Sequence, residues 1–310
     1  MERFQELVTI TAGILAGFYG MLVQEISYIA APARAAAPTT EVLFIGDMMF
    51  DRSIRVAMQS YGSDFIFSCI STELAAADLT VGNLEGPITP YPSKSVGSAV
   101  GSHDNFVFTF PEYVAPLLHR QNVRVVSLGN NHIYNFGEEG VDSTVRALEA
   151  AKVGYFGEPG GYSVSEVESN GVPLTLIGYN EFDEGSTPLL AINQITDARE
   201  KKRIPVVFAH WGDEYKPATE REISLAHKFI DAGAELVIGA HPHVIQASEI
   251  YKGKHIYYSL GNFIFDQYWN EAVSTGLTVR VTFNEQGVFA VHESKVSLGR
   301  DRRTCPVKEE

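Results

Sequence analysis

The sequence has few cysteines and few basic residues for its length. Two cysteines, Cys69 and Cys305, occur among 310 residues, and neither belongs to a C-x-x-C pair, which argues against a thiolate metal site. Lysine and arginine total 24 against 38 aspartates and glutamates, so the formal net charge is −14. This shortage of positive charge argues against non-specific binding to nucleic acid or to anionic membrane surfaces. We therefore expect no nucleic-acid partner.

The chain also lacks internal repeats and long linkers. Its 310 residues allow one large or two small domains, and 45% hydrophobic with 20% charged residues is ordinary for a globular protein with a full core. Cys69 lies in an apolar helical context and is predicted to be a packed thiol. Cys305 lies in the charged C-terminal tail, residues 299–310, which is predicted to be frayed.

An uncharged run of 17 residues occupies positions 7–23. It is long for the apolar part of a signal peptide and at the short limit for a membrane span. Small residues follow it, with Ala35-x-Ala37 as a candidate cleavage site. Residues 1–40 are therefore predicted to be a signal peptide or a membrane anchor, and the protein to be exported to the periplasmic or extracellular side. Because acidic residues accompany the single arginine of the first six positions, a cytoplasmic protein with an apolar leader helix stays an open alternative.

From residue 41 onward, strand-like and helix-like segments alternate. Apolar runs typical of buried strands occupy residues 41–46, 77–82, 123–129, 172–179, 204–210, 234–241 and 255–262. Helical periodicity marks residues 52–60, 111–121, 141–152 and 219–233. Residues 276–298 alternate with period two around a turn at 284–287, which predicts a hairpin. The pattern predicts one α/β domain at 41–298, with a polar, Gly/Ser-rich loop at 90–105 that is typical of lids or disordered segments.

Polar side chains follow six of the strands, and a glycine stands beside nearly every one. In chain order these side chains are Asp47; Asn83 and Glu85; Asn130, Asn131 and His132; His210; His241 and His243; and Asn262 and Asp266. Ligands of α/β sheets bind beyond the carboxyl ends of the strands. We therefore expect these side chains to meet at one site.

Imidazole nitrogens together with carboxylate and amide oxygens are ligands of Zn, Mn and Fe. Two such ions need about six to eight protein groups, and together they can bridge a phosphate and activate a water. The side chains at these strand ends supply about that many groups. We expect one or two divalent transition-metal ions.

Each residue alone has a plainer explanation. His241 or His243 by itself would more often be a turn histidine, and Asp47 could be the N-cap of the helix at 52–60. Asn83 and Asn131 could cap helices or form Asx turns. A metal site is therefore predicted from the clustering of all these residues at consecutive strand ends, and not from any one of them.

Six motifs in order resemble those of the capsule-synthesis protein CapA family. They read GDMMFDR, GNLEGPIT, SLGNNHIYNFG, AHWGDEY, GAHPHVIQ and YYSLGNFIFDQ, and they cover residues 41–268. CapA is similar to the calcineurin-like metallophosphoesterase superfamily. The resemblance implies a four-layer α/β/β/α sandwich with mixed sheets and a site at one edge. It also implies a role in making or exporting poly-γ-glutamate or another capsule polymer at the outer side of the membrane.

The resemblance also carries site residues over to this chain. Asp47 matches the aspartate of the superfamily's first motif, Asn131 and His132 match its GNH motif, His210 its lone histidine, and His241 and His243 its GHxH motif.

Three departures from the superfamily pattern affect the predicted site. The first motif is D-x-H in the superfamily, but Met48 and Met49 follow Asp47 here, so one histidine is missing. The bridging aspartate of the second motif is replaced by Asn83, and the nearest carboxylate is Glu85. CapA proteins share these two departures. Asn135 also stands where many CapA proteins have an aspartate, so the resemblance is compatible with a weakened or single-metal site.

Three hypotheses follow from these patterns. The first is a metal-dependent hydrolase that acts on a phosphoester or on a γ-glutamyl linkage. In this hypothesis His132 is a further ligand or a general acid, Asp47 also takes part in catalysis, and the metal ligands are Asp47, Asn83, Glu85, Asn131, His210, His241 and His243. The second is a non-catalytic component that binds the end of an anionic polymer and presents it to membrane capsule-synthase subunits. The third is a structural role, in which the histidines only form turns. The expected partners are accordingly an anionic polymer or phosphoester and, in the second case, the synthase.

Overall fold

The computed structural model describes residues 37–160 and 164–307, so the predicted signal peptide or anchor lies outside the described residues except for its last four positions. No helix among the described residues is long and apolar enough to span a membrane. The first strand begins at Thr39, two residues before the predicted start of the domain.

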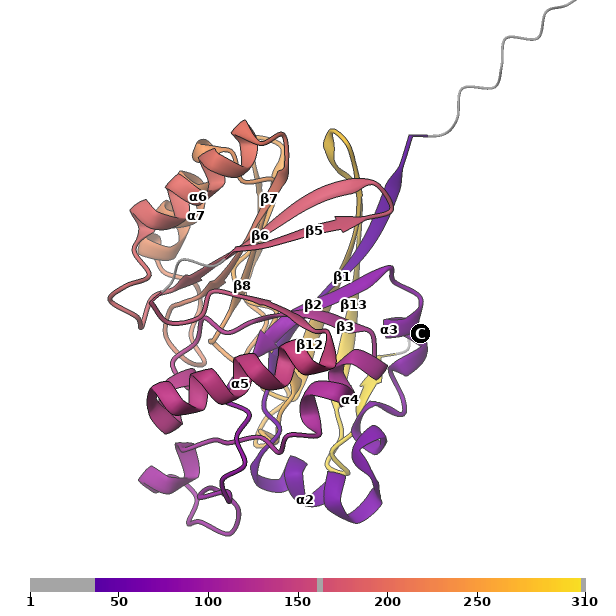
Figure 1. Ribbon diagram of the computed structural model, residues 1–310, viewed down its shortest axis with the longest axis vertical. Helices are drawn as coiled ribbons and strands as arrows, with labels where there is room; N and C mark the ends of the chain where they lie inside the picture. Colours follow the sequence, from indigo (N-terminus) through magenta and orange to yellow (C-terminus); the bar gives the residue numbers. More distant parts are fainter. Residues whose placement is uncertain (1–36, 161–163, 308–310) are drawn as a thin grey trace, which may run out of the picture. The chain divides into compact units, whose positions relative to one another are not determined.

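Two mixed sheets form the centre of the domain (Figure 1). The first contains β1 (Thr39–Met48), β2 (Leu79–Leu84), β3 (Val123–Ser127), β4 (Gly154–Phe156), β11 (Asn262–Ile264), β12 (Thr275–Asn284), β13 (Gly287–Leu298) and β14 (Thr304–Pro306). Its order is β14-β13-β12-β1-β2-β3-β4, with β11 also paired to β1. The second contains β5 (Val164–Ser169), β6 (Val172–Asn180), β7 (Ile204–His210), β8 (Leu236–Ala240), β9 (Ser248–Tyr251) and β10 (Lys254–Tyr257), in the order β5-β6-β7-β8-β10-β9.

The strands that lead to the predicted site run parallel within each sheet. β1, β2, β3, β4 and β11 pair in parallel in the first sheet, and β6, β7, β8 and β10 do so in the second. The remaining pairings are antiparallel, including the predicted hairpin of β12 and β13, where Asn284 stands opposite Gly287. Parallel pairing brings the carboxyl ends of β1, β2 and β3 to one edge, and those of β7 and β8 to another.

Helices cover the outer face of each sheet. The segments α2 (Arg52–Tyr61), α3 (Ser71–Ala75), α4 (Val114–Arg120) and α5 (Gly137–Ala151), with the 3-10 turns η1 (Ser63–Phe67), η2 (His103–Phe106) and η3 (Ile133–Phe136), accompany the first sheet, and α6 (Pro188–Glu200) and α7 (Glu220–Ala232) pack on the second. α7 begins with the capping box of Thr219 and Glu222, in which each residue satisfies a backbone N–H of the other.

Three hydrophobic clusters of described residues lie between the two sheets and between each sheet and its helices. Val42 and Phe44 of β1 point into the core between the sheets, where they join Leu174 of β6 and Val206 of β7. Leu43, between them, points to the opposite face and packs under the helices of the first sheet. A third cluster lies between the second sheet and α6 and α7. The alternation of inward and outward side chains follows from the period of two along a strand. The expected four-layer α/β/β/α sandwich with mixed sheets is confirmed.

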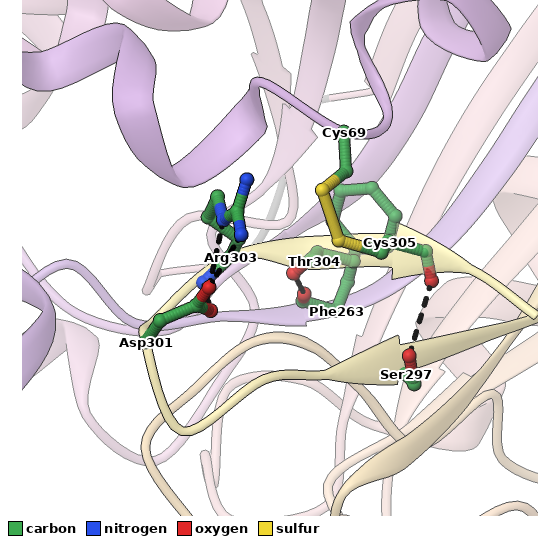
Figure 2. The surroundings of a disulfide bond; sticks show 7 residues. All are labelled: Cys69, Phe263, Ser297, Asp301, Arg303, Thr304 and Cys305. Atoms are coloured by element: carbon green, nitrogen blue, oxygen red, sulfur yellow. Dashed lines mark hydrogen bonds and ion pairs between the residues drawn. A yellow bond between two sulfur atoms is a disulfide. The ribbon is translucent and has the colours of Figure 1, made fainter.

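The C-terminal tail differs from its prediction. Residues 304–306 form β14, which pairs antiparallel with β13, and Thr304 is buried. Cys305 is joined by a disulfide to Cys69, with 4.8 Å between their Cα atoms (Figure 2). The predictions of a packed thiol at Cys69 and a frayed tail are therefore wrong, because Cys69 is in a disulfide and the bridge and the strand pairing hold the tail to the first sheet. Residues 308–310 lie outside the described part of the chain.

Candidate metal centre

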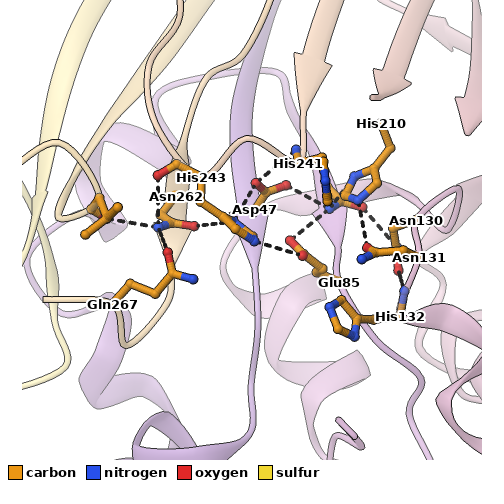
Figure 3. A network of polar contacts seen from close by, with 12 residues as sticks. Asp47, Glu85, Asn130, Asn131, His132, His210, His241, His243, Asn262 and Gln267 are labelled. Atoms are coloured by element: carbon orange, nitrogen blue, oxygen red, sulfur yellow. Dashed lines mark hydrogen bonds and ion pairs between the residues drawn. The ribbon is translucent and has the colours of Figure 1, made fainter. Parts of the chain in front are cut away.

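The ends of β1 and β2 in the first sheet meet those of β7 and β8 in the second (Figure 3). Asp47 stands opposite Asn83 in the parallel pairing of β1 and β2. His210 is the last residue of β7 and pairs with Ala240, which is followed by His241. The two sheets therefore contribute the carboxylates and the imidazoles, respectively, to one buried cluster.

Two groups of buried side chains in this cluster are close enough to hold a metal ion. The first consists of Glu85, His210 and His241, and the second of Asp47, Glu85 and His243. Within each group the ligand atoms lie within 4.8 Å of one another. Glu85 belongs to both, so its carboxylate lies between two candidate positions.

Asn83 holds the two carboxylates in place. Its Nδ2 donates to Asp47 Oδ1 at 2.8 Å and to Glu85 Oε2 at 3.4 Å. Its Oδ1 accepts from Asn130 Nδ2 at 3.1 Å, and the same Nδ2 donates to the carbonyl of Leu84 at 2.8 Å. Asn130 thereby fixes which way the Asn83 amide faces. The nitrogen of Asn83, rather than its oxygen, points at the acidic groups.

His243 is positioned from several sides. Its Nδ1 lies 3.3 Å from Asp47 Oδ2 and 3.0 Å from Asn262 Oδ1. Its Nε2 lies 3.4 Å from Glu85 Oε1. Asn262 is itself held by the carbonyl of His243 at 3.3 Å and by Gln267 Oε1 at 3.0 Å. Such outer hydrogen bonds orient ligating imidazoles in metal sites.

His210 and His241 lie side by side, with ring centroids 4.8 Å apart. His210 Nε2 is 3.0 Å from Asn131 Oδ1, so Asn131, which was predicted to be a ligand, contacts a member of the first group. The backbone N–H of His241 donates to Asp47 Oδ2 at 3.2 Å. The exposed ring of Phe182 covers the pair, at 4.4 Å from the ring of His241 and 5.8 Å from that of His210.

The turn that carries His241 and His243 is strained. Their φ angles are +95° and +58°, a region that side chains other than glycine rarely adopt and that costs about 1–3 kcal/mol per residue. Such strain persists where the surroundings determine the conformation, and it concentrates at functional sites. A turn that merely connected β8 to β9 would not need two histidines in this conformation.

The backbone of β1 approaches that of Gly261 closely at Gly46, and this approach positions Asp47 in the cluster. A β-carbon at position 46 would lie 1.9 Å from the carbonyl oxygen of Gly261. Glycine therefore lets β1 lie against the segment before β11, where the N–H of Asp47 donates to the carbonyl of Gly261 at 3.0 Å.

The electrostatics of the cluster suit a divalent cation. Burial keeps the pKa of His210 well below its ordinary value and lowers that of His241 to about 4, so both imidazoles are neutral, as metal ligands must be. Burial, and then the charge of Asp47, raise the pKa of Glu85 well above its usual range. Burial would also raise the pKa of Asp47, but the hydrogen bond and charge of His243 lower it overall.

The buried polar atoms of the cluster lack partners at two points. Glu85 Oε1 and His241 Nδ1 are buried without a hydrogen-bond partner among the described residues. Among the described residues, His243 is the ion-pair partner of both Asp47 and Glu85. Buried charges and unpaired polar atoms are costly unless they are compensated. A divalent ion with nitrogen and oxygen ligands would compensate them, so the residues fit Zn, Mn or Fe.

His132 lies beside Glu85 in Figure 3 but belongs to neither candidate group. Its ring packs against Phe108, with centroids 4.4 Å apart, and its Nδ1 is 3.2 Å from Asn135 Oδ1. Asn135 Oδ1 also accepts from the N–H of Phe108 at 2.7 Å. Burial lowers the pKa of His132 to about 4. Its predicted role as a ligand or acid remains a prediction.

The structure rules out one plainer explanation, that Asp47 caps a helix, and shows which side chain occupies the position of the first-motif histidine. The N-cap residue of α2 is Asp51, not Asp47, and Asp47 is fully buried in the cluster. Met49 stands where the superfamily has the histidine of its first motif. Met49 is fully buried in the apolar layer under the helices, and its Sδ accepts from the N–H of Asp51 at 3.0 Å. The first motif therefore brings Asp47, and no histidine, to the cluster.

The site also contains three aromatic residues outside the predicted set, two of which lie within the motifs AHWGDEY and YYSLGNFIFDQ. Phe182 follows β6, and Tyr215 lies in the loop after β7, with its ring 6.1 Å from that of His243. Phe265 lies on the other side of His243, at 4.7 Å. Phe182 and Tyr215 are large exposed aromatics, a signal that can be recognised only once the fold has brought the loops together.

Comparison with known proteins identifies a family whose sequence pattern matches most of the chain. The family described as bacterial capsule synthesis protein PGA_cap matches residues 41–267. The chain is 31% identical over 258 residues to the capsule biosynthesis protein CapA of Bacillus anthracis, covering 75% of this chain and 61% of that protein. It is 28% identical over 289 residues to the PGA biosynthesis protein CapA of Bacillus subtilis (strain 168), covering 86% and 73%. The match therefore spans less than two thirds of the first of these relatives.

A more distant match covers about half of the chain. A probable polyglutamine synthesis accessory protein of Mycobacterium tuberculosis is 27% identical over 186 residues, which cover 49% of this chain and 47% of that protein.

Proposed function

Since the chain belongs to the bacterial capsule synthesis protein family PGA_cap, within the metallophosphoesterase-like superfamily, we propose that it is a metal-dependent hydrolase of capsule synthesis. Its substrate is a phosphoester or a γ-glutamyl linkage, handled during the synthesis or export of poly-γ-glutamate or a related polymer. The names of the two Bacillus relatives, a capsule biosynthesis protein and a PGA biosynthesis protein, support this role.

The shared position of Glu85 carries the proposal. Along an extended strand, residues two apart point to the same side, so Glu85 can supply the carboxylate that Asn83 lacks. Its carboxylate belongs to both candidate groups. Asp47 and His243 would hold one ion, and His210 and His241 the other. Bound ions would polarise the scissile group and lower the pKa of a water.

The other residues of the cluster would position the metal ligands and transfer protons. Asn83 holds Asp47 and Glu85 through its amide nitrogen, and Asn131 orients His210. His132, kept neutral by burial and held by Asn135, can exchange a proton or hydrogen bond with the leaving group beside Glu85. Phe182 covers His210 and His241 and limits access of water from that side.

A second function is favoured by one observation. Met49 packs into the core where the superfamily has a ligand, so the site has one group fewer for binding metal. In this alternative the chain binds the polymer at this site without cleaving it, and presents it to membrane synthase subunits.

We also propose that the protein functions outside the cytoplasm. Disulfides form and persist in oxidising compartments and are rare in the cytosol. The bridge between Cys69 and Cys305 therefore supports export, in agreement with the expected signal peptide or anchor at residues 1–40. Cell fractionation tests this point, and recovery of the full-length chain in the cytoplasm would contradict it.

The hydrolase proposal is tested on the full-length chain. Its bound Mn, Zn and Fe are measured by elemental analysis after incubation with each metal, and turnover of a generic phosphodiester and of a γ-linked glutamate oligomer is then followed. We expect bound metal and metal-dependent cleavage of one of the two. Bound metal without cleavage of either supports the non-catalytic alternative, and absence of bound metal contradicts the assignment of the site.

A further inference from the structure

A cavity of about 590 Å³ opens beside the candidate metal centre, within the roughly 300–1,000 Å³ of small-ligand sites. Its walls come from the start of α2 (residues 52–56), the loop at 95–106, residues 214–215 after β7, and residues 266–269 after β11. The Gly/Ser-rich loop, expected to be a lid or disordered, thus forms one wall. Bonds within it, such as that from Asn105 Nδ2 to Ser98 Oγ at 3.1 Å, hold it together.

Two residues of the cavity connect it to the metal centre. The N–H of Tyr215 donates to the carbonyl of Pro242, between the two histidines of that turn, at 2.9 Å. Gln267 Nε2 donates to the Tyr215 hydroxyl at 3.0 Å, and Gln267 Oε1 accepts from Asn262, which in turn contacts His243. A molecule in the cavity therefore lies next to the side of the centre that carries His243.

The lining is rich in exposed apolar groups. Of the fifteen exposed large hydrophobic residues in the described part of the chain, six line this cavity. Phe106, Tyr215 and Trp269 are 48%, 43% and 61% exposed. The rings of Tyr215 and Trp269 meet edge to face, with centroids 5.5 Å apart. Such a concentration on one surface marks a site of recognition.

The charges of the lining leave a net negative site. Arg52, the one basic residue among the described residues of the lining, is paired with Asp266 at 2.6 Å and lies over the ring of Phe108 at 5.1 Å. Arg302 contacts Ser53 Oγ but does not line the cavity. Glu214 forms no ion pair with any residue that the structure describes. An exposed carboxylate beside aromatic rings is complementary to an organic cation, because ring faces attract cations as well.

From this combination we infer that the cavity binds the ammonium group at the amino end of a chain whose next linkage lies at the metal centre. Glu214, Tyr215 and Trp269 are the groups that hold it. A polyanionic chain finds no unpaired cation on this lining, but each γ-glutamyl chain carries one ammonium at its amino end. The inference rests on the proposed function and deepens it, since it selects between the two substrate classes.

An ammonium site beside the centre favours the γ-glutamyl linkage over the phosphoester. Hydrolysis of an amide breaks the C–N bond and consumes one water. The acyl carbon takes the oxygen of that water and becomes a carboxylate. The nitrogen keeps its own hydrogen, takes both protons of the water and leaves as an ammonium at neutral pH. One product of that reaction is the ligand for which the cavity is suited. Hydrolysis of a phosphoester of an alcohol releases no cation.

Trp269 reports on the cavity directly. The chain has two tryptophans, and Trp211 is fully buried, with its Nε1 donating to the carbonyl of Tyr258. A ligand in the cavity should therefore change the fluorescence of Trp269 and leave that of Trp211 constant. The full-length chain, as purified and after metal removal, is titrated with a γ-linked glutamate trimer that has a free amino end, and with the same trimer N-acetylated.

We expect saturable binding of the free trimer in both states of the protein, and binding of the acetylated trimer about fivefold weaker or worse, the scale of one charge–aromatic contact. Glu214→Gln should remove this preference. Asp213→Asn is the matched control, because Asp213 is exposed, pairs with Lys216 at 3.3 Å and lies outside the cavity. Equal binding of the two trimers, or equal behaviour of the two variants, would overturn the inference. If metal binding or turnover fails while the preference for the free amino end persists, the hydrolase proposal falls and the ammonium site stands.

Discussion

Asn83 donates a hydrogen bond from its amide nitrogen to Asp47 Oδ1 at 2.8 Å, although it occupies the position of the superfamily's bridging carboxylate. The orientation is imposed by Asn130, which donates to the oxygen of the same amide. Asn83 therefore stabilises the charge of its neighbours and does not replace the missing one. That charge comes from Glu85, whose carboxylate belongs to both candidate groups.

This arrangement predicts the order of two substitutions. Glu85→Gln removes a charge that would contact both ions, and charge-assisted contacts are about twice as strong as neutral ones. Asn83→Ala removes a supporting hydrogen bond, an effect that typically lowers metal affinity about 10- to 100-fold. We expect Glu85→Gln to lower the metal affinity by more than this factor. Metal titrations of the two variants side by side decide the order. If Asn83→Ala loses the metal and Glu85→Gln keeps it, Glu85 only supports the site, which is then closer to a one-metal centre of histidine and asparagine.

The two histidines of the strained turn allow a stricter test of the site. His241 and His243 belong to different candidate groups, so replacing both with alanine takes one ligand from each position. We expect the double variant to bind no metal in elemental analysis. His292→Ala is the control, because His292 is exposed on β13, where its Nε2 lies 3.3 Å from Ser294 Oγ, and it belongs to neither candidate group. A double variant that retains the metal content of the wild-type chain would show that the cluster is not the metal site.

The strand ends could be predicted from sequence because short, continuous apolar runs followed by a glycine and a polar residue are local patterns. Parallel pairing then brings Asp47 opposite Asn83 without further information. The division of the cluster into two groups around Glu85 could not be predicted, because it depends on how the second sheet packs against the first. Nor does any periodicity mark Tyr215 or Trp269, which lie in loops.

Gly46 links the fold to the site in a way that a single substitution can test. In Gly46→Ala the new β-carbon would meet the carbonyl oxygen of Gly261 at 1.9 Å, so β1 must move away and take Asp47 with it. Overpacking of this kind costs about 1–3 kcal/mol or more. We expect a lower midpoint of urea unfolding together with weaker metal binding. Gly154→Ala, whose β-carbon would meet only ordinary contacts, should change metal binding little. Unchanged metal affinity in Gly46→Ala would show that the position of Asp47 does not depend on this approach.

The disulfide gives a prediction about stability that composition did not suggest. Its two cysteines are 236 residues apart, and spacing in a sequence does not reveal pairing. Cys69 lies between η1 and α3, whereas Cys305 lies in β14, where Thr304 Oγ1 donates to the carbonyl of Phe263. Closing so long a loop restricts the unfolded chain, and removing a native bridge typically costs about 2–4 kcal/mol. We expect the double substitution of both cysteines by serine to lower the free energy of unfolding by that amount in urea titrations. Wild-type chain treated with a reductant should match the double variant, because both lack the cross-link. Equal unfolding midpoints for the oxidised and reduced wild-type chain would mean that pairing of β14 with β13, rather than the bridge, holds the C-terminal segment in place.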